Sequence, residues 1–303
     1  MDNNEYKRIF YFNITFSCNN KCRNCISHST MNHNIQVIDV NDLIAIDELY
    51  HIRSIDIVNI NGGEPTLSCY FEEIINWIFD RSHHIVVYSN GRNISRLPRK
   101  IINKIERFII PIYGHEYAHD KYVGVNGAYH ETMESLIGLL NAGIVDKCEI
   151  KLLFDETGNI EDFIQCDDWQ LLLSNHRFSI TRVLDNINDC QPCSLMLSSK
   201  AEETIVSLIR HGKCIKFYDF PICQFSKSFQ DYLEMIYDNE PIQYSENVIY
   251  CGKNGNSIHV DYRRKTSYWE KCKKCSKSII CTQIMHNYFC PIIENDVCKL
   301  IIE

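Results

Sequence analysis

Short apolar segments alternate with amphipathic ones through residues 8–210, and this alternation constrains the fold more than any other feature. Apolar and β-branched runs predict strands at 8–16, 55–60, 84–88, 108–114, 149–154 and 178–184. Apolar residues at helical spacing predict helices at 41–52, 68–79, 99–106, 131–141 and 202–211. Strands that alternate with helices form parallel sheets. The sequence therefore predicts an α/β fold with six parallel strands.

Two helix ends carry recognisable signals. Asp39 or Asn41 is placed to cap the start of the first helix, because its side chain can accept hydrogen bonds from free backbone N–H groups. Gly143 follows the helix at 131–141 and is expected to end it, since glycine tolerates the left-handed backbone of a helix stop.

Cys18, Cys22 and Cys25 form a C-x3-C-x2-C loop directly after the first strand. Thiolate is the soft ligand that iron–sulfur clusters require. A [4Fe–4S] cluster has four irons, so three cysteines leave one iron open for another ligand. A zinc loop or three unrelated thiols is the alternative, although zinc sites usually combine paired C-x2-C units with a fourth ligand.

The C-x3-C-x2-C spacing resembles the signature of the radical S-adenosylmethionine (SAM) superfamily. The resemblance implies a partial (β/α)6 TIM-like barrel over residues 8–210 and a [4Fe–4S] cluster on Cys18, Cys22 and Cys25. It implies that the open iron binds the amino and carboxylate groups of SAM, which is reduced to a 5′-deoxyadenosyl radical. An electron donor such as flavodoxin or ferredoxin goes with that chemistry. One departure is Asn24, where the superfamily often has an aromatic residue.

Gly62, Gly63, Glu64 and Pro65 follow the second strand. Two glycines let a ligand approach the backbone, and free carbonyls with Glu64 can accept hydrogen bonds from an ammonium group. A plain turn is the alternative. The stretch looks like the GGEP motif of radical SAM enzymes, which implies contacts to the SAM amino group.

Ser89 and Asn90 end the third strand, where small polar side chains suit the recognition of hydroxyl groups. The resemblance implies that they lie near the ribose or methionine portion of SAM, and a plain turn is again the alternative. After the fourth strand, His119 and Asp120 resemble a His-Asp pair found in peptide- and cofactor-maturing radical SAM enzymes. We expect either a local capping pair or a contact to substrate or a proton.

Cysteines accumulate after the helix at 202–211, which suggests a small Cys-rich extension over residues 211–303. Cys272, Cys275 and Cys281 form a C-x2-C-x5-C run that resembles the SPASM and twitch extensions of radical SAM enzymes. This resemblance implies an auxiliary [4Fe–4S] cluster. Its fourth ligand is Cys223, in a Pro-x-Cys turn, or Cys251.

The extension departs from a full SPASM domain, because eight residues separate Cys281 from the next cysteine, Cys290. We therefore expect one auxiliary cluster, with a structural zinc site as the alternative. Cys214 or Cys290 could return a hydrogen atom to a substrate radical, since an S–H bond is weaker than the C–H bond it would repair. Such a step would produce epimerisation.

Composition narrows the classes of protein to which the chain could belong. The chain has 303 residues with 45% hydrophobic content, enough for a sizeable core, and no apolar run as long as a membrane span. The sequence contains sixteen cysteines and shows no recognisable signal peptide at its start. Together these two features predict a reducing, cytoplasmic setting, in which abundant cysteine indicates metal binding. A net charge of -8 argues against general nucleic-acid binding, although basic residues at 263–277 leave an RNA-binding patch open.

The leading functional prediction is a radical SAM enzyme that modifies a ribosomally synthesised peptide by cross-linking, epimerisation or oxidation. A radical SAM oxidoreductase acting on a small molecule or a cofactor precursor is the second reading. The alternative that involves no catalysis is a zinc-binding or RNA-binding protein.

Overall fold

A nine-stranded sheet forms the centre of the computed structural model, in the order β7-β6-β5-β4-β3-β2-β1-β8-β9. The structure describes residues 8–23, 25, 27, 29, 37–144, 146–154, 172, 176–182, 202–203, 213–218, 225–231 and 245–263. The strands are β1 (Arg8–Thr15), β2 (Ile57–Gly62), β3 (His84–Tyr88), β4 (Arg107–Ile112), β5 (Cys148–Phe154), β6 (Arg177–Arg182), β7 (Lys213–Tyr218), β8 (Ser245–Cys251) and β9 (Ser257–Arg263).

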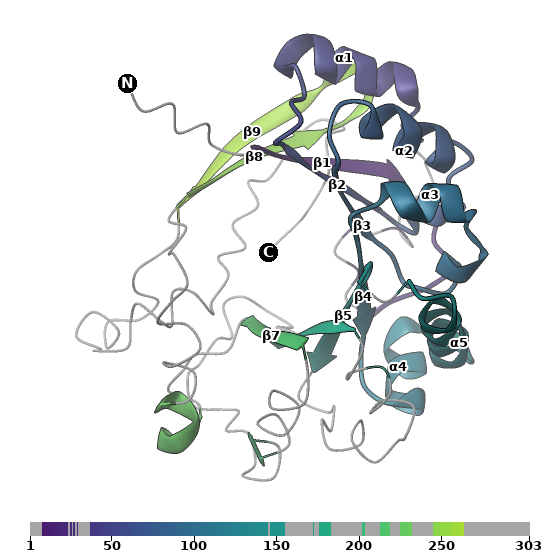
Figure 1. The fold of residues 1–303 in the computed structure, drawn as a ribbon, viewed down its shortest axis with the longest axis vertical. Coiled ribbons are helices and arrows are strands. Elements are labelled where there is room, and N and C mark those ends of the chain that lie inside the picture. The colour runs from purple at the N-terminus through teal and green to yellow at the C-terminus, as the bar shows by residue number, and fades with distance from the viewer. Residues whose placement is uncertain are drawn as a thin grey trace.

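The six predicted strands are all present as β1 to β6, and they lie side by side in chain order. Every neighbouring pair from β1 to β7 is parallel, which confirms the predicted α/β class. The sheet curves but stays open, as a partial barrel does (Figure 1).

Three strands were not predicted. β7 extends the sheet beyond β6, while β8 pairs parallel to β1 on its other side and β9 returns antiparallel to β8. All three fall within residues 211–303, so part of the expected extension belongs to the same sheet as the expected barrel. The division of the chain near residue 210 stays a prediction.

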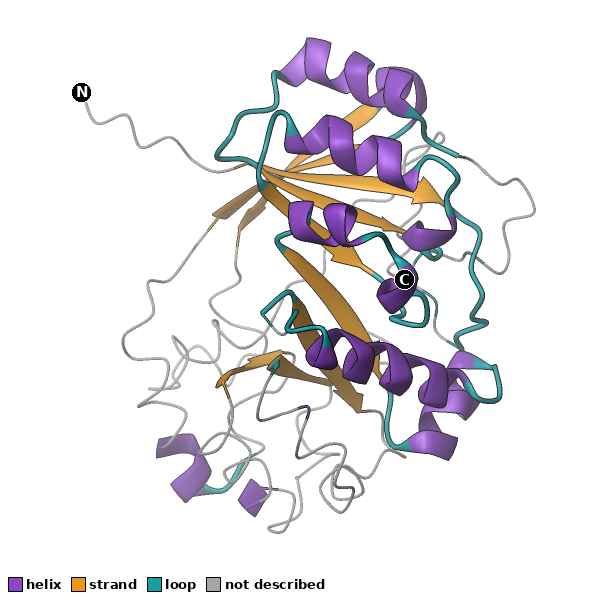
Figure 2. Ribbon diagram, turned by 45° about the vertical axis from the view of Figure 1, so that its right-hand side comes forward, coloured by secondary structure: helices purple, strands orange, loops and turns teal. Residues whose placement is uncertain are grey.

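The helices are α1 (Val40–Tyr50), α2 (Phe71–Phe79), α3 (Arg99–Lys104), α4 (Glu116–Val123) and α5 (Ala128–Asn141). Helices α1, α2, α3 and α5 cover one side of the sheet (Figure 2). The sequence predicted four of these five helices but not α4. None of the helices in the described part of the chain is long and apolar enough to cross a bilayer.

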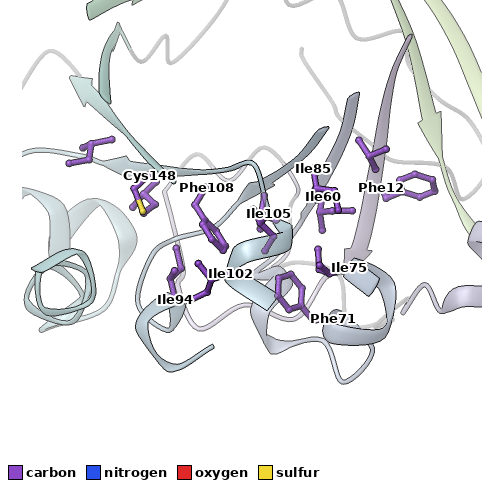
Figure 3. Packing of buried hydrophobic residues seen from close by; sticks show 14 of the residues in the cluster. Phe12, Ile60, Phe71, Ile75, Ile85, Ile94, Ile102, Ile105, Phe108 and Cys148 are labelled. Carbon is purple, nitrogen blue, oxygen red and sulfur yellow. The ribbon is translucent and has the colours of Figure 1, made fainter. Parts of the chain in front are cut away.

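Alternate strand residues build the core between the sheet and these helices. Figure 3 shows Ile60 and Ile85 of the sheet facing Phe71 and Ile75 of α2. Cys148 is fully buried in the same cluster, as expected for a core thiol. The hydrophobic effect of burying this layer thus fixes the helices on one side of the sheet.

Both predicted helix-end signals are confirmed. Asp39 caps α1, with its carboxylate accepting hydrogen bonds from the N–H groups of Asn41 and Asp42, and the Asp42 side chain completes a capping box. After α5, Gly143 adopts a φ of +71°, the left-handed region that favours glycine.

A buried ion-pair group braces the other end of the first strands. Asp56 precedes β2 and is fully buried, and its carboxylate lies 2.5 Å from the Arg8 guanidinium and 2.9 Å from that of Arg53. Burial alone would raise the pKa of Asp56, but the hydrogen bonds from Arg8 and Arg53 outweigh it and lower this pKa to about 2.

Candidate functional site

The cysteine loop lies at the C-terminal end of β1, beside the ends of β2 and β3. Two backbone hydrogen bonds hold the end of β2 to the approach of this loop, from Gly63 N–H to Thr15 O and from Glu64 N–H to Ser17 O, both 2.7 Å. The polar stretches after β1, β2 and β3 therefore meet at one edge of the sheet, where βα barrels carry their active sites.

The two glycines after β2 make room for the chain's own backbone. A Cβ atom on Gly62 would lie 2.1 Å from the carbonyl oxygen of Thr15, and one on Gly63 would lie 2.3 Å from that of Ser17. Gly62 also has a φ of +137°. From the sequence we expected these glycines to let a ligand approach the backbone. In the structure, the segment that leads into the cysteine loop packs against them instead.

Glu64 ties the end of β2 to the end of β3. Its fully buried carboxylate accepts hydrogen bonds from the Ser89 hydroxyl (2.8 Å), the Asn90 N–H (2.7 Å), and both the N–H and the hydroxyl of Thr66. Burial raises the pKa of Glu64, while these four donors favour the charged form. With its carboxylate so engaged, contacts to a ligand ammonium group would fall mainly to backbone carbonyl oxygens.

Ser89 and Asn90 are both brought to the site but are engaged differently. The Ser89 hydroxyl is buried, donating to Glu64 and accepting a hydrogen bond from Gly91 N–H (3.1 Å). The Asn90 side chain donates to the Asn19 side-chain oxygen over 2.6 Å. Asn90 thus contacts the residue that follows Cys18, while Ser89 braces Glu64.

Arg92 is a site residue that the sequence did not predict. Its Nη1 donates to Asn19 O (2.6 Å) and Asn20 Oδ1 (3.0 Å), and its Nε donates to Glu131 Oε2 (2.8 Å). The signal available was an arginine directly after the polar stretch Ser89–Gly91. Arginine there has a rigid, multiply donating head group suited to several acceptors at once.

The far side of the cysteine loop is held by the end of α4. Lys21 N–H donates to Val123 O (2.7 Å), and Arg23 N–H donates to Tyr122 O (2.9 Å). Gly124 then ends the helix with a φ of +67°, and a Cβ atom there would lie 2.8 Å from Lys21 O. The unpredicted helix α4 is therefore a second support for the loop.

His119 and Asp120 have separate structural partners. The Asp120 carboxylate accepts hydrogen bonds from the N–H groups of Gly127 and Tyr129 at the start of α5, so it caps that helix. His119 Nδ1 accepts a hydrogen bond from Tyr113 N–H (3.2 Å), and burial lowers the pKa of His119 to about 4. Of the two expectations, local capping describes Asp120.

The three loop thiols are half-buried and free. The Sγ of Cys25 lies 3.3 Å from Ser27 Oγ and 3.2 Å from Ser29 Oγ. Burial, together with the nearby Cys25 and Cys18, raises the pKa of Cys22 to about 12. Thiolates in this loop therefore need a positive partner, which a bound metal group supplies.

The donor set of this loop fits an iron–sulfur cluster. Among the residues that the structure describes, no three His, Cys, Asp or Glu side chains are arranged to hold one metal ion. An iron–sulfur cluster takes each cysteine on a separate iron, so its ligands do not converge on one point. Three half-buried thiols on a loop held from both sides suit that kind of group.

The other cysteines expected at the site are mostly outside the described residues. Cys251, at the end of β8, is buried in the hydrophobic core cluster, with its thiol 3.6 Å from Ile249 O. Cys214 lies in β7. The predicted ligands and hydrogen donors outside the described residues are Cys223, Cys272, Cys275, Cys281 and Cys290. The roles assigned to all of these cysteines stay predictions.

Curated relatives match parts of the chain. An AdoMet-dependent heme synthase from Nitratidesulfovibrio vulgaris is 24% identical over 161 residues, 52% of this chain and 44% of that protein. An S-adenosylmethionine-dependent nucleotide dehydratase from Selenomonas ruminantium is 26% identical over 102 residues, 33% of this chain and 36% of that protein. The chain thus matches less than half the length of these relatives. No family model matches the chain.

Solved structures share the fold over more of the chain. Native anSMEcpe with bound AdoMet superposes with a TM-score of 0.57 at 14% identity, over 91% of this chain and 88% of that one. Streptococcus suis SuiB bound to precursor peptide SuiA gives 0.51 at 13% identity, over 70% and 49% of the two chains.

At such low identities these likenesses establish the fold. The names of the curated relatives are a separate observation, because both state a dependence on SAM. This chain carries its C-x3-C-x2-C loop at the end of β1. Both curated relatives are named for their dependence on SAM, and the solved structures share the fold of this chain.

Proposed function

We propose that the protein is a radical SAM enzyme, which reductively cleaves SAM to a 5′-deoxyadenosyl radical and abstracts hydrogen from a substrate. The observation that carries this proposal is the loop of Cys18, Cys22 and Cys25, fixed where β1, β2 and β3 end. Three cysteines on a cluster of four irons leave one iron open for SAM. The SAM-dependent curated relatives support the same chemistry.

A [4Fe–4S] cluster bound here would supply an electron, taken from a donor such as flavodoxin or ferredoxin, and SAM would supply the radical. The protein contributes position. Cys18, Cys22 and Cys25 would hold the cluster, and the backbone around Gly62–Pro65 would face the amino group of SAM. Glu64, Ser89 and Asn90 keep the ends of β2 and β3 in register with the cysteine loop.

For the substrate we infer a ribosomally synthesised peptide, modified by cross-linking, epimerisation or oxidation. Two structures with the same fold contain peptides: SuiB bound to its precursor peptide SuiA, and anSMEcpe bound to AdoMet and the Cp18Cys peptide. The fold therefore has room for a peptide in at least two proteins that share it.

A small molecule or a cofactor precursor is the second candidate substrate. The observation in its favour is that the curated relatives are named as a heme synthase and a nucleotide dehydratase. Production of 5′-deoxyadenosine stimulated by a short peptide, but not by nucleotides or porphyrins, would separate the two candidates; the opposite pattern would favour the small molecule.

An auxiliary [4Fe–4S] cluster on Cys272, Cys275 and Cys281 is also part of the proposal, to accept an electron from the substrate radical or to bind the substrate. Cys223 is the better candidate for its fourth ligand, because Cys251 is buried in the apolar core like a structural thiol. Cys214 or Cys290 would donate hydrogen if the product is an epimer.

A reducing, cytoplasmic setting completes the proposal. Six cysteines are free thiols in the structure: Cys18, Cys22, Cys25, the exposed Cys69, Cys148 and Cys251. Free thiols persist where the cell keeps them reduced, and a cluster on thiolate ligands needs the same conditions.

The test is anaerobic reconstitution of the full chain with iron and sulfide, followed by assay of SAM cleavage. We expect bound iron and sulfide and reductant-dependent 5′-deoxyadenosine, both lost in Cys22→Ala. Cys69→Ala, which removes an exposed thiol, is the matched control and should behave as the wild type. A colourless protein with stoichiometric zinc and no SAM cleavage would instead support the non-catalytic zinc or RNA-binding reading.

A further inference from the structure

We propose that Arg92 is a positioning residue that fixes the turn between Cys18 and Cys22 before any metal group binds. The inference rests on the proposed function only in taking this loop to be the cluster-binding loop. Its basis is a set of contacts that run from the end of β3 and from α5 to the residues between the first two cysteines.

The Arg92 side chain connects three parts of the chain. Nη1 donates to Asn19 O and Asn20 Oδ1, at 2.6 and 3.0 Å, while Nε donates to Glu131 Oε2 of α5 at 2.8 Å. The Arg92 side chain is only 10% exposed and Asn20 only 4%, so their contact is shielded from water, whereas the Glu131 side chain is 45% exposed. They are charge-assisted hydrogen bonds, which are stronger than neutral ones.

Neighbouring groups hold Arg92 and the loop in the same arrangement. The Asn90 side-chain oxygen accepts a hydrogen bond from Arg92 N–H (3.1 Å), and its amide donates to the Asn19 side chain. Asn20 is itself buried, at 4% exposure, so its amide oxygen is directed to Arg92 rather than to solvent. Both residues that follow Cys18 are thereby bound to the segment Asn90–Arg92.

The third residue of this turn is held from the opposite side. Lys21 N–H donates to the end of α4, as does Arg23 N–H beyond Cys22. The backbone between Cys18 and Cys22 is therefore fixed by Arg92 on one side and by α4 on the other. A turn that is ordered in advance does not have to lose conformational entropy when the cysteines take up a metal group.

Only arginine supplies this set of donors. The guanidinium group is planar and reaches Asn19, Asn20 and Glu131 through two of its nitrogens at once. The lysine ammonium is a compact point charge that cannot span the same three acceptors. Arg92→Lys should therefore keep the positive charge but retain only part of the positioning of the turn between Cys18 and Cys22.

The test compares Arg92→Gln and Arg92→Lys with the wild type, using the full chain before and after anaerobic reconstitution. Arg81→Gln is the matched control, because Arg81 pairs with Asp47 and stacks on Trp77, away from the loop. The readouts are hydrogen exchange of the Asn20, Lys21 and Arg23 amides in the metal-free chain, then bound iron and the electron paramagnetic resonance spectrum of the reduced protein.

In Arg92→Gln we expect the loop amides to exchange about tenfold faster, as expected when charge-assisted hydrogen bonds are lost, while amides of β1 exchange as before. Bound iron should fall and the cluster spectrum should broaden or shift. Arg92→Lys should recover part of both effects, and Arg81→Gln should leave the loop unchanged.

Wild-type exchange at the loop amides of Arg92→Gln, together with full iron content and an unaltered spectrum, would overturn the inference. Faster exchange throughout the sheet would overturn it as well, since Arg92 would then stabilise the fold generally. A wild-type chain that takes up no iron would refute the proposed function, while the exchange comparison on the metal-free chain would still decide the role of Arg92.

Discussion

At the scale of single residues, Glu64 has a different role from the one its motif suggests. The sequence Gly-Gly-Glu-Pro points to an acceptor for a ligand, yet the carboxylate is fully buried and receives four hydrogen bonds from Thr66, Ser89 and Asn90. It therefore acts as a brace between β2 and β3. Such a brace influences ligand binding through the geometry of the strand ends.

We predict that Glu64→Gln lowers the free energy of unfolding by about 2 kcal/mol, because an amide NH2 would face donors that need an acceptor. Urea unfolding of the metal-free chain measures this. Glu72→Gln, on the exposed side of α2, is the matched control and should change stability by less than about 0.5 kcal/mol. A fully stable Glu64→Gln protein that had lost SAM binding would instead assign Glu64 to the ligand.

Asp56 gives a prediction on pH. Its pKa is lowered from 3.8 to about 2, so the folded state holds the proton more weakly than the unfolded state. The resulting stabilisation, roughly 2 kcal/mol, is complete above pH 3.8 and is lost as the pH falls through 2. Unfolding free energies of the wild type and Asp56→Asn should therefore converge as the pH is lowered from 6 towards 2.

The exposed Asp80, at the end of α2, supplies the control for this measurement. Asp80→Asn removes an exposed carboxylate and is measured beside Asp56→Asn under the same conditions. If Asp56→Asn ran parallel to the wild type down to pH 2, the ion pairs with Arg8 and Arg53 would contribute nothing that depends on the charge of Asp56.

At the scale of elements, the cysteine loop is supported by the β2–α2 turn and by α4. The turn reaches the loop through Gly62 and Gly63, which leave no room for a side chain against Thr15 and Ser17. The end of α4 reaches it through backbone carbonyls of Tyr122 and Val123. Either support can be removed without touching a cysteine.

Gly63→Ala should show this, because the added methyl group would lie 2.3 Å from Ser17 O. We expect a loss of more than about 2 kcal/mol of stability or a displaced loop that binds several-fold less iron. Gly138→Ala is the control: Gly138 lies inside α5, where alanine meets only the Ser95 Cβ at 3.5 Å and should stabilise by about 1 kcal/mol. An unchanged Gly63→Ala protein would show that the turn does not support the loop.

The sequence predicted elements well where a local pattern specified them. Residues such as Phe10, Phe12 and Ile14 alternate along β1, and helix α2 places Phe71, Ile74, Ile75 and Ile78 on one face. Helix α4 was not predicted, because it buries only His119, Tyr122 and Val123 and so shows no apolar repeat in the sequence. Strand β8 was not predicted, because its place in the sheet depends on pairing with β1, some 240 residues away. No local sequence pattern encodes such a long-range pairing.

The site was predictable to a similar extent. The cysteines, the glycine turn and Ser89–Asn90 were identified from their types and spacing, and the structure places them together. The partners of Glu64 and the contacts of Arg92 were not predictable, because each depends on which side chains meet when separate strand ends come together. Spacing along the chain identifies chemical groups but not their hydrogen-bond partners.

At the scale of the whole molecule, the proposed chemistry divides between the loop after β1 and the Cys-rich end of the chain. We predict that Cys275→Ala retains some reductive SAM cleavage but loses product formation, since the auxiliary cluster would act after the radical forms. Quantifying 5′-deoxyadenosine and product in the same reaction measures this, with Cys69→Ala as the control. Full product formation by Cys275→Ala would remove the auxiliary cluster from the mechanism.

The antiparallel return of β9 sets a tether length for that second centre. β8 runs parallel to β1, so β9 ends at Arg263 beside the start of β8, the edge of the sheet opposite the cysteine loop. Cys272 lies nine residues after Arg263, a reach of at most about 30 Å, while the seven steps between the eight residues of β1 alone span about 23 Å. Cys272 therefore lies within about 30 Å of Arg263, and only an extended connecting chain could bring it to the radical-forming end.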